Sequence, residues 1–581
     1  MVYTGNKLLA DMFNEIADML SVDEAPNSKF EVRAYKKAAL TIGTLQEPIE
    51  QMYANGGKEA LMSLPGIGKG LAEKIEEYIK TGKISRYEGL KEKYPIKMGE
   101  LTSVQGIGPK TAVELYRSLG VRDIGDLKKA LQGHKVGKLP GFGEKSEELL
   151  TKGIELFESS KGRFLLGDAL PEAEQIVALL DKSGLVERAV IAGSTRRMRE
   201  TIGDLDILAT SKEPENVMEF FSGLNVVEHI MVRGATKTTA WLKIGLSCDL
   251  RVIEPDSFGA ALQYFTGSKD HNVQVRQIAV KKGYKLNEYG LYDKKDKLIS
   301  SKNEEDIYET LGMQWMPPEM REARGEVKLA QEHKIPKLVE LGDIKGDMHT
   351  HTKETDGANT LEEMAEAAMA AKLQYIAVTN HTKSLQVAHG MNDRQFKDFF
   401  KKTDKLNAKL DGKLIVLKGG EVDILKDGSL DLEDETLKQM DCVVASVHSS
   451  FKMSEDEMTK RIEKAFDTGL VTIFGHPTGR EVNGREPYAV NLEKVAESAE
   501  RNGVALEIDA FPSRLDLNDT NIMLVSNYKI LFSIDSDAHS TSHFGFLRYG
   551  VGTARRGWLQ KERVINTRSL EDLKKLIKRS E

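Results

Sequence analysis

The amino-acid sequence predicts three kinds of fold along a chain of 581 residues. Up to about residue 160, apolar residues recur at helical spacing between Gly and Pro, which predicts an all-α region. From about residue 188, short β-branched strands separate helical segments, which predicts an α+β region. From residue 344 onward strands and helices alternate, which predicts an α/β barrel-like domain. The length agrees with several domains, since a single core rarely exceeds roughly 300 residues.

The composition is that of an ordinary globular protein, with 40% hydrophobic and 30% charged residues. No apolar run approaches the roughly 20 residues that cross a bilayer, and no signal peptide is evident, so we expect a cytoplasmic protein without a membrane partner. The two cysteines lie in apolar strand-like stretches, which suits a reducing compartment. A net charge of -7 argues against a generally basic surface, although carboxylates gathered around metal ions would give the same average.

The helical region repeats one short pattern, an apolar residue followed by a Gly-x-Gly turn and the start of a helix. It occurs in LPGIGKGLAEKI (64–75), VQGIGPKTAVEL (104–115) and LPGFGEKSEELL (139–150). Such a turn presents backbone N–H groups at the positive end of a helix dipole, where a phosphate can bind without sequence readout. One copy alone is more often an ordinary turn between helices, but three copies predict contact with a DNA backbone. The glycines expected to make this contact are Gly66, Gly68, Gly106 and Gly108.

Three acidic residues mark the α+β region. In GSTRRMRETIGDLDIL (193–208), strand alternation places Asp204 and Asp206 on one face, and Asp249 lies within the apolar strand of SCDLRVIEP. The alternative is a strand that merely ends in a polar turn. Because an unpaired carboxylate inside an apolar strand is costly, the three together predict a site for two hard cations, Mg²⁺ or Mn²⁺. Donors for a triphosphate are expected from Gly193, Ser194, Arg196, Arg197 and Gly203.

Eight of the 12 histidines lie between residues 349 and 543. Most of them directly follow expected strands, together with carboxylates, so their side chains should converge at one end of the barrel. A single histidine of this kind is more often a buried core residue than a ligand. The whole set predicts a multi-metal site of Mn²⁺, Zn²⁺ or Fe²⁺ suited to phosphoester hydrolysis. Its members are His349, His351, Asp356, His381, Glu421, His448, His476, Asp537 and His539.

These motifs together resemble a known family. The GS-x-RR and DLD motifs, with FGAALQYFTGSKDHNVQVR at 258–276, resemble the nucleotidyltransferase palm of family X DNA polymerases. The Gly-x-Gly turns resemble helix-hairpin-helix elements, residues 28–90 resemble the lyase domain of DNA polymerase beta, and the histidine region resembles a polymerase and histidinol phosphatase (PHP) domain. The resemblance implies six parts. The helical part consists of a lyase-like domain with a helix-hairpin-helix at 1–88 and a fingers-like DNA-binding region with another at 89–162. They are followed by an α+β palm at 163–256, a thumb-like subdomain at 257–316, a linker at 317–342 and a PHP domain with a distorted βα barrel at 343–575.

The resemblance also assigns roles to single residues outside the carboxylate sites. It places Tyr264 and Phe265 beside the incoming sugar, adds Gly267 and Asn272 to the nucleotide site, and places Arg276 against the template. Without it, the two aromatic residues would be taken for helix-packing residues.

Lys74 falls at the position of the lysine that forms a Schiff base with an abasic sugar. Glu31 stands where the family has a supporting lysine, so Lys74 as a solvated helix lysine remains an alternative.

In the PHP domain the resemblance implies nine ligands for about three ions. Asn380 stands where the family has Asp before a ligand histidine, and we expect its amide to accept a hydrogen bond from a ligand imidazole. Arg480 and Arg514 are candidate phosphate clamps, with surface arginines as the alternative.

The resemblance implies a DNA polymerase that fills short gaps in base excision repair, with a 3′-5′ exonuclease or abasic-site endonuclease in the PHP domain. Its partners would be gapped or primer-template DNA and deoxynucleoside triphosphates, with a monomer as the default. Two alternatives remain open for the PHP domain: a phosphoesterase of small molecules, or a domain that only stabilises the fold.

Overall fold

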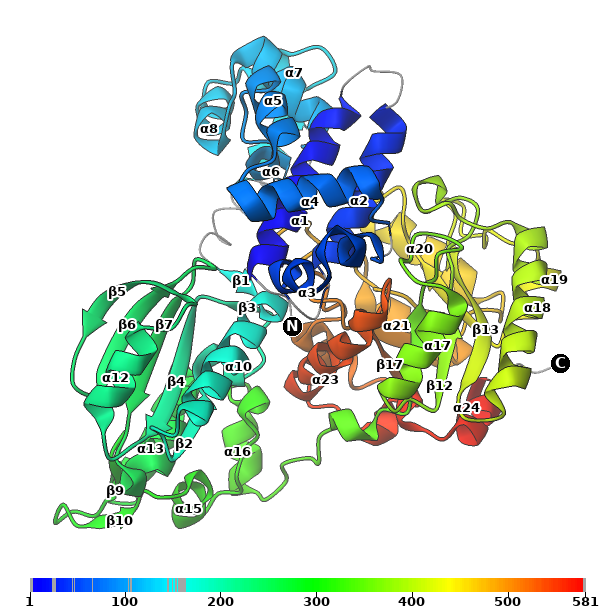
Figure 1. Ribbon diagram of the computed structural model, residues 1–581. Helices are drawn as coiled ribbons and strands as arrows, with labels where there is room; N and C mark the ends of the chain where they lie inside the picture. Colours follow the sequence, from blue (N-terminus) through cyan, green and yellow to red (C-terminus); the bar gives the residue numbers. More distant parts are fainter. Residues whose placement is uncertain are drawn as a thin grey trace.

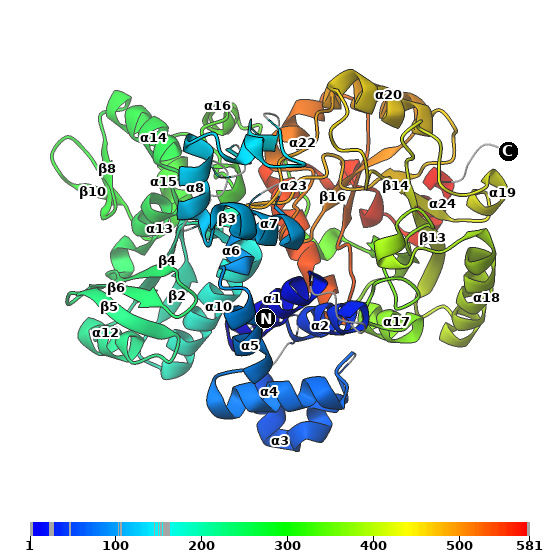
Figure 2. The ribbon, with the colours of Figure 1, turned by 90° about the horizontal axis from the view of Figure 1, so that it is seen from above.

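The computed structural model describes residues 4–577, except for 23–27, 44, 46–47, 65, 103, 105–106, 144–145, 149, 152–153 and 155–162. Gly106, one of the predicted phosphate-contacting glycines, lies outside the described residues. Figure 1 shows three bodies, which are the N-terminal helices (blue), an open sheet with its helices (cyan to green) and the C-terminal barrel (green to red). The sheet and the barrel lie side by side in both views, and the helical region lies over them (Figures 1 and 2).

The helical region consists of short helices around one shared core. These are α1 (Thr4–Ser21), α2 (Ser28–Gly43), α3 (Ile49–Met62), α4 (Lys69–Thr81), α5 (Ser85–Lys93), α6 (Met98–Thr102), α7 (Pro109–Leu119), α8 (Ile124–Gln132) and the 3-10 helix η1 (Val136–Lys138). One cluster of buried apolar side chains extends from Leu9 to Ile154, across the boundary expected at residue 88. The lyase-like and fingers-like parts therefore pack as one unit. Among the described helices, none combines the length and apolar character needed to span a membrane.

The palm is built on a five-stranded sheet with the order β2-β4-β7-β6-β5. Fully buried and partly buried residues alternate along β6 and β7, so that one face packs on the core and the other stays accessible. The elements of the palm are β1 (Phe164–Leu165), α10 (Leu166–Ser183), β2 (Arg188–Ile191), α11 (Gly193–Arg196), β3 (Thr201–Ile202), β4 (Asp204–Thr210), α12 (Pro214–Ser222), β5 (Val227–Arg233), β6 (Lys237–Leu242) and β7 (Ser247–Val252).

The thumb adds three α-helices, a short 3-10 helix and a small antiparallel sheet of order β10-β9-β8. Its elements are η2 (Pro255–Ser257), α13 (Phe258–Thr266), α14 (Lys269–Lys281), β8 (Lys285–Asn287), β9 (Gly290–Tyr292), β10 (Leu298–Ser300) and α15 (Glu304–Thr310). The stretch expected as a linker contains η3 (Pro318–Met320), α16 (Glu326–Gln331) and η4 (Leu341–Asp343). It is not a free connection, because Val327 and Ala330 of α16 join the thumb core and Arg321 is fully buried.

The C-terminal domain is a nearly closed barrel of seven parallel strands in sequence order, β11 to β17. A parallel bridge between Thr350 and Ala538 joins the two ends of the sheet. The strands are β11 (Gly346–Thr350), β12 (Tyr375–Val378), β13 (Ile415–Asp423), β14 (Cys442–Ser446), β15 (Ile473–Phe474), β16 (Ala505–Asp509) and β17 (Phe532–Asp535). The predicted βα barrel is thus confirmed.

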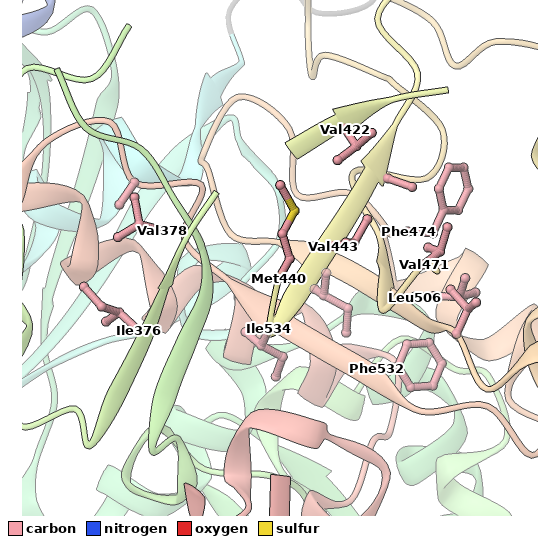
Figure 3. Close-up of a cluster of buried hydrophobic side chains, with 14 of the residues drawn as sticks. Ile376, Val378, Val422, Met440, Val443, Val471, Phe474, Leu506, Phe532 and Ile534 are labelled. Carbon is pink, nitrogen blue, oxygen red and sulfur yellow. The ribbon is translucent and has the colours of Figure 1, made fainter. Parts of the chain in front are cut away.

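Helices surround this barrel and cover the outer face of its strands, whereas alternate strand residues such as Met348, Ala377 and Val444 form a second buried cluster, so both faces of the strands are buried. The helices are α17 (Leu361–Ala370), η5 (Gln386–Ala388), α18 (Asp393–Leu410), α19 (Asp434–Leu437), α20 (Glu455–Phe466), α21 (Leu492–Asn502), α22 (Asp519–Val525), η6 (Thr541–Phe546), α23 (Leu547–Arg556), η7 (Lys561–Arg563), η8 (Ile565–Thr567) and α24 (Leu570–Ile577). Side chains such as Ile376, Val443 and Phe532 point from the strands into the apolar layer (Figure 3).

The palm and the barrel share part of a core. Leu515 and Tyr549 of the barrel are fully or almost fully buried within the palm's apolar cluster. Arg548 of α23 forms an ion pair with Glu174 of α10, with both nitrogen-to-oxygen distances at 3.0 Å. The two domains are therefore packed against each other by apolar and ionic contacts.

Candidate active sites in the palm and the barrel

The three palm carboxylates lie on two adjacent parallel strands. Asp204 and Asp206 belong to β4, Asp249 belongs to β7, and Asp206 stands opposite Asp249 in the strand register. Asp204 is exposed, whereas the other two are partly buried. The structure therefore brings together the three carboxylates that the sequence singled out, on the accessible face of the sheet.

The charges at this face favour a bound cation. Burial, together with the neighbouring Asp204 and Asp249, raises the pKa of Asp206 to about 6. Burial alone would raise the pKa of Asp249 as well, but hydrogen bonds from Lys237 and Thr239 outweigh it and lower the pKa. A divalent cation between the carboxylates would offset their repulsion, so these residues fit a Mg²⁺ or Mn²⁺ site.

Two cationic side chains that the sequence did not single out complete this face. Lys237 Nζ lies 2.8 Å and Arg251 Nη2 lies 3.2 Å from Oδ2 of Asp249. Arg251 also lies over the ring of Phe265, 4.5 Å from its centroid. Lys237 and Arg251 are partners in the register of β6 and β7, and strand alternation from Asp249 could have identified both.

The turn before the carboxylates requires glycine at its first position. Gly193 has φ 61°, and a Cβ on it would collide with the carboxylate of Asp206. Ser194 follows it, partly buried, in α11. Gly203, the residue before β4, would bring a Cβ to 3.2 Å from Nη1 of Arg163. The backbone of this turn thus comes close to the carboxylate site.

The two arginines of the same turn are held by acidic residues from later in the chain. Arg196 forms a bidentate pair with Glu304, with both distances at 3.0 Å. Arg197 Nε lies 3.1 Å from Glu322, and its Nη1 donates to the Thr266 carbonyl at 2.5 Å. Both guanidinium groups are thus held in ion pairs. Their acidic partners, Glu304 and Glu322, were not predicted from the sequence.

The aromatic pair at the end of α13 lies next to Arg251. The Tyr264 and Phe265 rings meet edge to face, with their centroids 5.1 Å apart. Asn272 is buried in this structure, where it donates to the Tyr264 carbonyl at 2.7 Å and accepts from Gln263 at 2.8 Å. Both polar groups of Asn272 thus hold the end of α13 in place.

Two further thumb residues lie nearby, namely Gly267, predicted at the nucleotide site, and Arg276, predicted against the template. Gly267 has φ 68°, and a Cβ on it would lie 3.2 Å from Nη1 of Arg197. Arg276 is partly buried on α14, one turn after Asn272, and donates through Nε to the Asn272 carbonyl at 3.3 Å.

The nine predicted ligands of the barrel converge around Glu421 on β13. Five imidazoles have a nitrogen within 3.6 Å of its carboxylate, namely His349, His351, His381, His448 and His476. Asp537 lies 3.1 Å from His351, and Asp356 lies 3.3 Å from His381 and 3.5 Å from His539. Three overlapping groups have ligand atoms within 4.8 Å of one another: His351, Asp356, His381 and His539; His349, His351 and Glu421; and His381, Glu421 and His448.

The cluster also has the chemistry of a metal site. In the described part of the chain, its buried atoms without a hydrogen-bond partner include Nε2 of His349, both ring nitrogens of His351 and Oδ1 of Asp537. Burial, with nearby positive charge, lowers the pKa of His351 to about 4 and that of His476 to about 3, so both imidazoles are neutral at pH 7. Neutral imidazoles and buried carboxylates are suitable ligands, and several ligand atoms here have no hydrogen-bond partner, so the residues fit bound transition metals.

Comparison with known proteins agrees with both sites. Residues 261–322 match the model of the DNA polymerase beta thumb, residues 4–84 match a helix-hairpin-helix domain, residues 98–155 match a helix-hairpin-helix tandem, and residues 347–510 match the PHP domain. The DNA polymerase/3′-5′ exonuclease PolX of Bacillus subtilis (strain 168) is 37% identical over 558 residues, which are 96% of each chain. The chain belongs to the family X DNA polymerases with a C-terminal PHP domain.

Two other relatives match parts of this family X chain. A probable phosphatase of Thermoanaerobacter sp. (strain X514) is 30% identical over 232 residues, 38% of this chain and 89% of the phosphatase. DNA polymerase lambda of Arabidopsis thaliana is 24% identical over 355 residues, 54% of this chain and 62% of that polymerase. The thumb match extends to residue 322, so it includes part of the stretch expected as a linker.

Acidic residues behind the PHP ligands hold the imidazoles in orientation. Glu507 of β16 lies 2.7 Å from Nδ1 of His349, and Asp423 lies 3.0 Å from Nδ1 of His448. Carboxylates in these positions fix the ring orientation and raise the basicity of the ligand. The sequence prediction missed both, although Glu507 is a charge inside the apolar strand ALEID, the same signal that identified Asp249.

Backbone strain is concentrated at the same end of the barrel. His476 has φ 27° and Asp537 has φ 49°, and each is a non-glycine residue two positions after the end of a strand. Such conformations persist where packing overdetermines them and are frequent at functional sites.

Asn380 does not make the contact that the sequence predicted. Its side-chain oxygen accepts from the Thr352 N–H at 2.9 Å and the Thr355 hydroxyl at 3.2 Å, instead of from a ligand imidazole. It therefore shapes the loop that carries Asp356, since that loop begins directly after His351.

The two candidate phosphate clamps differ in their surroundings. Arg480 is buried, and its Nη2 lies 2.6 Å from Glu200 of the palm and 2.7 Å from the Leu515 carbonyl. Arg514 Nε lies 3.4 Å from Asp509 and 3.8 Å from the ligand Asp537. Arg514 thus lies at the cluster, whereas Arg480 links the barrel to the palm.

The described glycines of the predicted helix-hairpin-helix turns, Gly66, Gly68 and Gly108, are exposed, as phosphate contact requires. Gly68 and Gly108 directly precede α4 and α7. Gly66 has φ 79°, and a Cβ on it would lie 2.7 Å from Cγ of Lys37, so this turn requires glycine. Lys74 is partly exposed and donates to the Gly70 carbonyl at 3.1 Å within α4.

Proposed function

We propose that this protein is a template-directed DNA polymerase that also degrades DNA from the 3′ end at a separate PHP site. The observation that carries the proposal is one chain with two carboxylate-based sites, on β4 and β7 of the palm and around Glu421 of the barrel. The agreement with a polymerase/3′-5′ exonuclease over nearly the whole chain supports the same assignment. We further propose a role in short-gap filling during base excision repair, with gapped DNA and deoxynucleoside triphosphates as partners.

In the polymerase reaction, Asp204, Asp206 and Asp249 would hold two Mg²⁺ or Mn²⁺ ions. The bound ions would supply positive charge to the attacking hydroxyl and to the pyrophosphate leaving group. Gly193 and Ser194 would offer backbone donors to the triphosphate, and Arg197 a planar cation. Tyr264 and Phe265 would lie beside the sugar, where their bulk disfavours a 2′-hydroxyl.

In the PHP site, the nine ligands would hold about three ions of Mn²⁺, Zn²⁺ or Fe²⁺. The ions would polarise the scissile phosphodiester and a water molecule. Arg514 carries its positive charge to the edge of the cluster, where it would bind a phosphate oxygen of the 3′-terminal nucleotide.

The helical region would bind the DNA backbone through its exposed turns at Gly66, Gly68 and Gly108. A lyase role for Lys74 is the least supported part of this proposal. The lysine donates to the Gly70 carbonyl of its own helix, and Glu31 stands at the sequence position where the family has a supporting lysine.

The test is primer extension and primer degradation by the full-length protein with Mg²⁺ and with Mn²⁺. Asp249→Ala should abolish extension and preserve degradation, whereas His349→Ala should do the reverse. Nucleotide-dependent lengthening and nucleotide-independent shortening are the two expected signals. A folded wild-type protein that neither extends nor shortens a primer with either metal would contradict the proposal.

A second candidate function for the barrel alone is hydrolysis of small phosphoesters. The similarity of the barrel to a probable phosphatase favours it. p-Nitrophenyl phosphate and single-stranded DNA, offered to the same preparation, separate the two functions. If the protein hydrolyses p-nitrophenyl phosphate and leaves the DNA undegraded, the phosphatase function is favoured.

A further inference from the structure

The two arginines of the phosphate turn are anchored by different parts of the chain. Arg196 is held inside the polymerase half by Glu304 of α15. Arg197 is held by Glu322, the last residue of the thumb match and part of the stretch expected as a linker. The second anchor continues into the barrel.

Glu322 is a buried carboxylate shared by three guanidinium groups. Its Oε1 lies 3.1 Å from Arg197 Nε and 2.9 Å from Arg556 Nη1, and its Oε2 lies 3.3 Å from Arg199 Nη1. The side chain is 8% exposed. Burial alone would raise its pKa, but Arg197 and Arg556 outweigh burial and lower the pKa. The carboxylate is therefore a fixed negative charge at neutral pH.

Arg556, the last residue of α23, connects this carboxylate to the barrel. Its Nη1 also donates to the carbonyl of Arg197 at 2.9 Å, and its Nη2 lies 2.6 Å from Asp519 at the start of α22. The helix contacts the turn a second time, because a Cβ on Gly552 would lie 2.6 Å from Cε of Met198. One barrel side chain thus contacts the backbone of Arg197 and the acid that orients its guanidinium.

The guanidinium of Arg197 has a second protein partner besides Glu322. Its Nη1 donates to the Thr266 carbonyl, and Nη2 has no hydrogen-bond partner among the residues that the structure describes. The charge of Arg197 also reaches the carboxylate site, where it opposes the larger effect of burial on the pKa of Asp206. The guanidinium is therefore held by Glu322 and the Thr266 carbonyl, close enough to the carboxylate site for its charge to act on Asp206.

We infer that Glu322 and Arg556 are positioning residues of the polymerase site, through which the PHP domain holds Arg197 in place for the incoming triphosphate. This inference rests on the proposed polymerase function. Neither residue belongs to the histidine cluster, so the positioning of Arg197 does not depend on hydrolysis in the barrel. The PHP domain is then a structural part of the nucleotide site as well as a second catalytic domain.

The experiment compares Arg556→Met with Arg555→Met in the full-length protein. Arg555 is a matched control, because it is the neighbouring residue on α23 and pairs with Glu319 at 2.7 Å and with the Val339 carbonyl at 3.0 Å. Single-nucleotide incorporation on gapped DNA gives KM for the nucleotide and kcat separately. Degradation of a single-stranded primer monitors the PHP site, and thermal unfolding checks that each variant folds.

Arg556→Met should raise KM for the nucleotide about tenfold with little change in kcat, as expected when an oriented charge contact to the substrate is lost. Glu322→Gln should shift KM in the same direction, which keeps the test valid if Arg556→Met does not fold. Arg555→Met should keep the wild-type KM, and all three variants should keep degradation.

Two results would overturn the inference. One is a wild-type KM in folded Arg556→Met and Glu322→Gln, and the other is an equal rise in Arg555→Met, which would indicate only a loosened interface. If the wild-type protein itself fails to extend DNA, the proposed function is refuted instead, so the two failures are distinguishable.

Discussion

Replacing Asp206 with Asn should stabilise the metal-free palm while abolishing primer extension. Burial and the charges of Asp204 and Asp249 raise the pKa of Asp206 from 3.8 to about 6. Each tenfold change in acidity corresponds to about 1.4 kcal/mol, so an ionised Asp206 at neutral pH costs the metal-free fold roughly 3 kcal/mol. Asn has the same shape without the charge and removes this cost, but it is a poor ligand for a hard cation.

The pH dependence of this gain follows from the direction of the pKa change. Because the pKa is raised in the folded state, the contribution of Asp206 to stability is fully present below its ordinary pKa of 3.8 and is lost as the pH rises through about 6. The difference in free energy of unfolding between Asp206→Asn and the wild type should therefore grow from pH 3.8 to about 6 and be constant above that. Asp204→Asn is the control, and it should gain less because Asp204 is exposed.

The assay is urea unfolding in the presence of a chelator, with amide hydrogen exchange of β4 and β7 as the local readout. A local readout is needed because a chain with several domains does not unfold in one step. Added Mn²⁺ should make the wild type more stable than Asp206→Asn, since only the wild type gains free energy from metal binding. The reasoning is refuted if Asp206→Asn is no more stable than the wild type in the chelator at neutral pH.

Four further predictions follow from the two sites. Gly193→Ala, which places a Cβ against Asp206 at φ 61°, should lower the extension rate by about 100-fold while degradation is unchanged; a wild-type rate would show that the turn is not part of the site. Glu507→Gln should weaken metal binding at the PHP site about 10-fold to 100-fold in a metal titration of nuclease activity, without affecting extension. Arg514→Met should lower the rate of DNA degradation, whereas Arg480→Met should mainly lower the unfolding temperature. The opposite pattern would indicate that Arg480 binds the phosphate and that Arg514 has a structural role. If Lys74 is a lyase nucleophile, Lys74→Ala should lose the borohydride-trapped adduct with abasic DNA, and a persistent adduct excludes it as the sole nucleophile.

Local sequence pattern was sufficient to predict the residues that converge at each site. Asp204, Asp206 and Asp249 were recognisable because charges inside apolar strands need a partner, and strand alternation determines which side they face. The barrel ligands were recognisable because parallel strands all end at the same side of the sheet. In both cases the prediction needed several such residues together, since one alone has a more ordinary explanation.

The partners that orient these residues depend on contacts between distant segments, and local pattern does not encode them. Glu304 and Glu322 follow Arg196 and Arg197 by more than 100 positions, and Arg556 lies in another domain. The stretch at 317–342 has a Pro pair and a polar composition that are typical of a linker, yet Arg321 within it is fully buried. Its burial depends on Glu304 and on the ring of Tyr308, which only the tertiary structure brings together.

We propose that the two sites of this chain work independently and act in sequence on a DNA 3′ end. The most direct measurement uses a primer with a mismatched 3′ nucleotide, incubated with Asp249→Ala, with His349→Ala, and with both proteins together. Asp249→Ala alone should shorten the primer without extending it, His349→Ala alone should leave the mismatch in place, and the mixture should restore full-length product. Loss of shortening in a folded Asp249→Ala protein would contradict two independent sites.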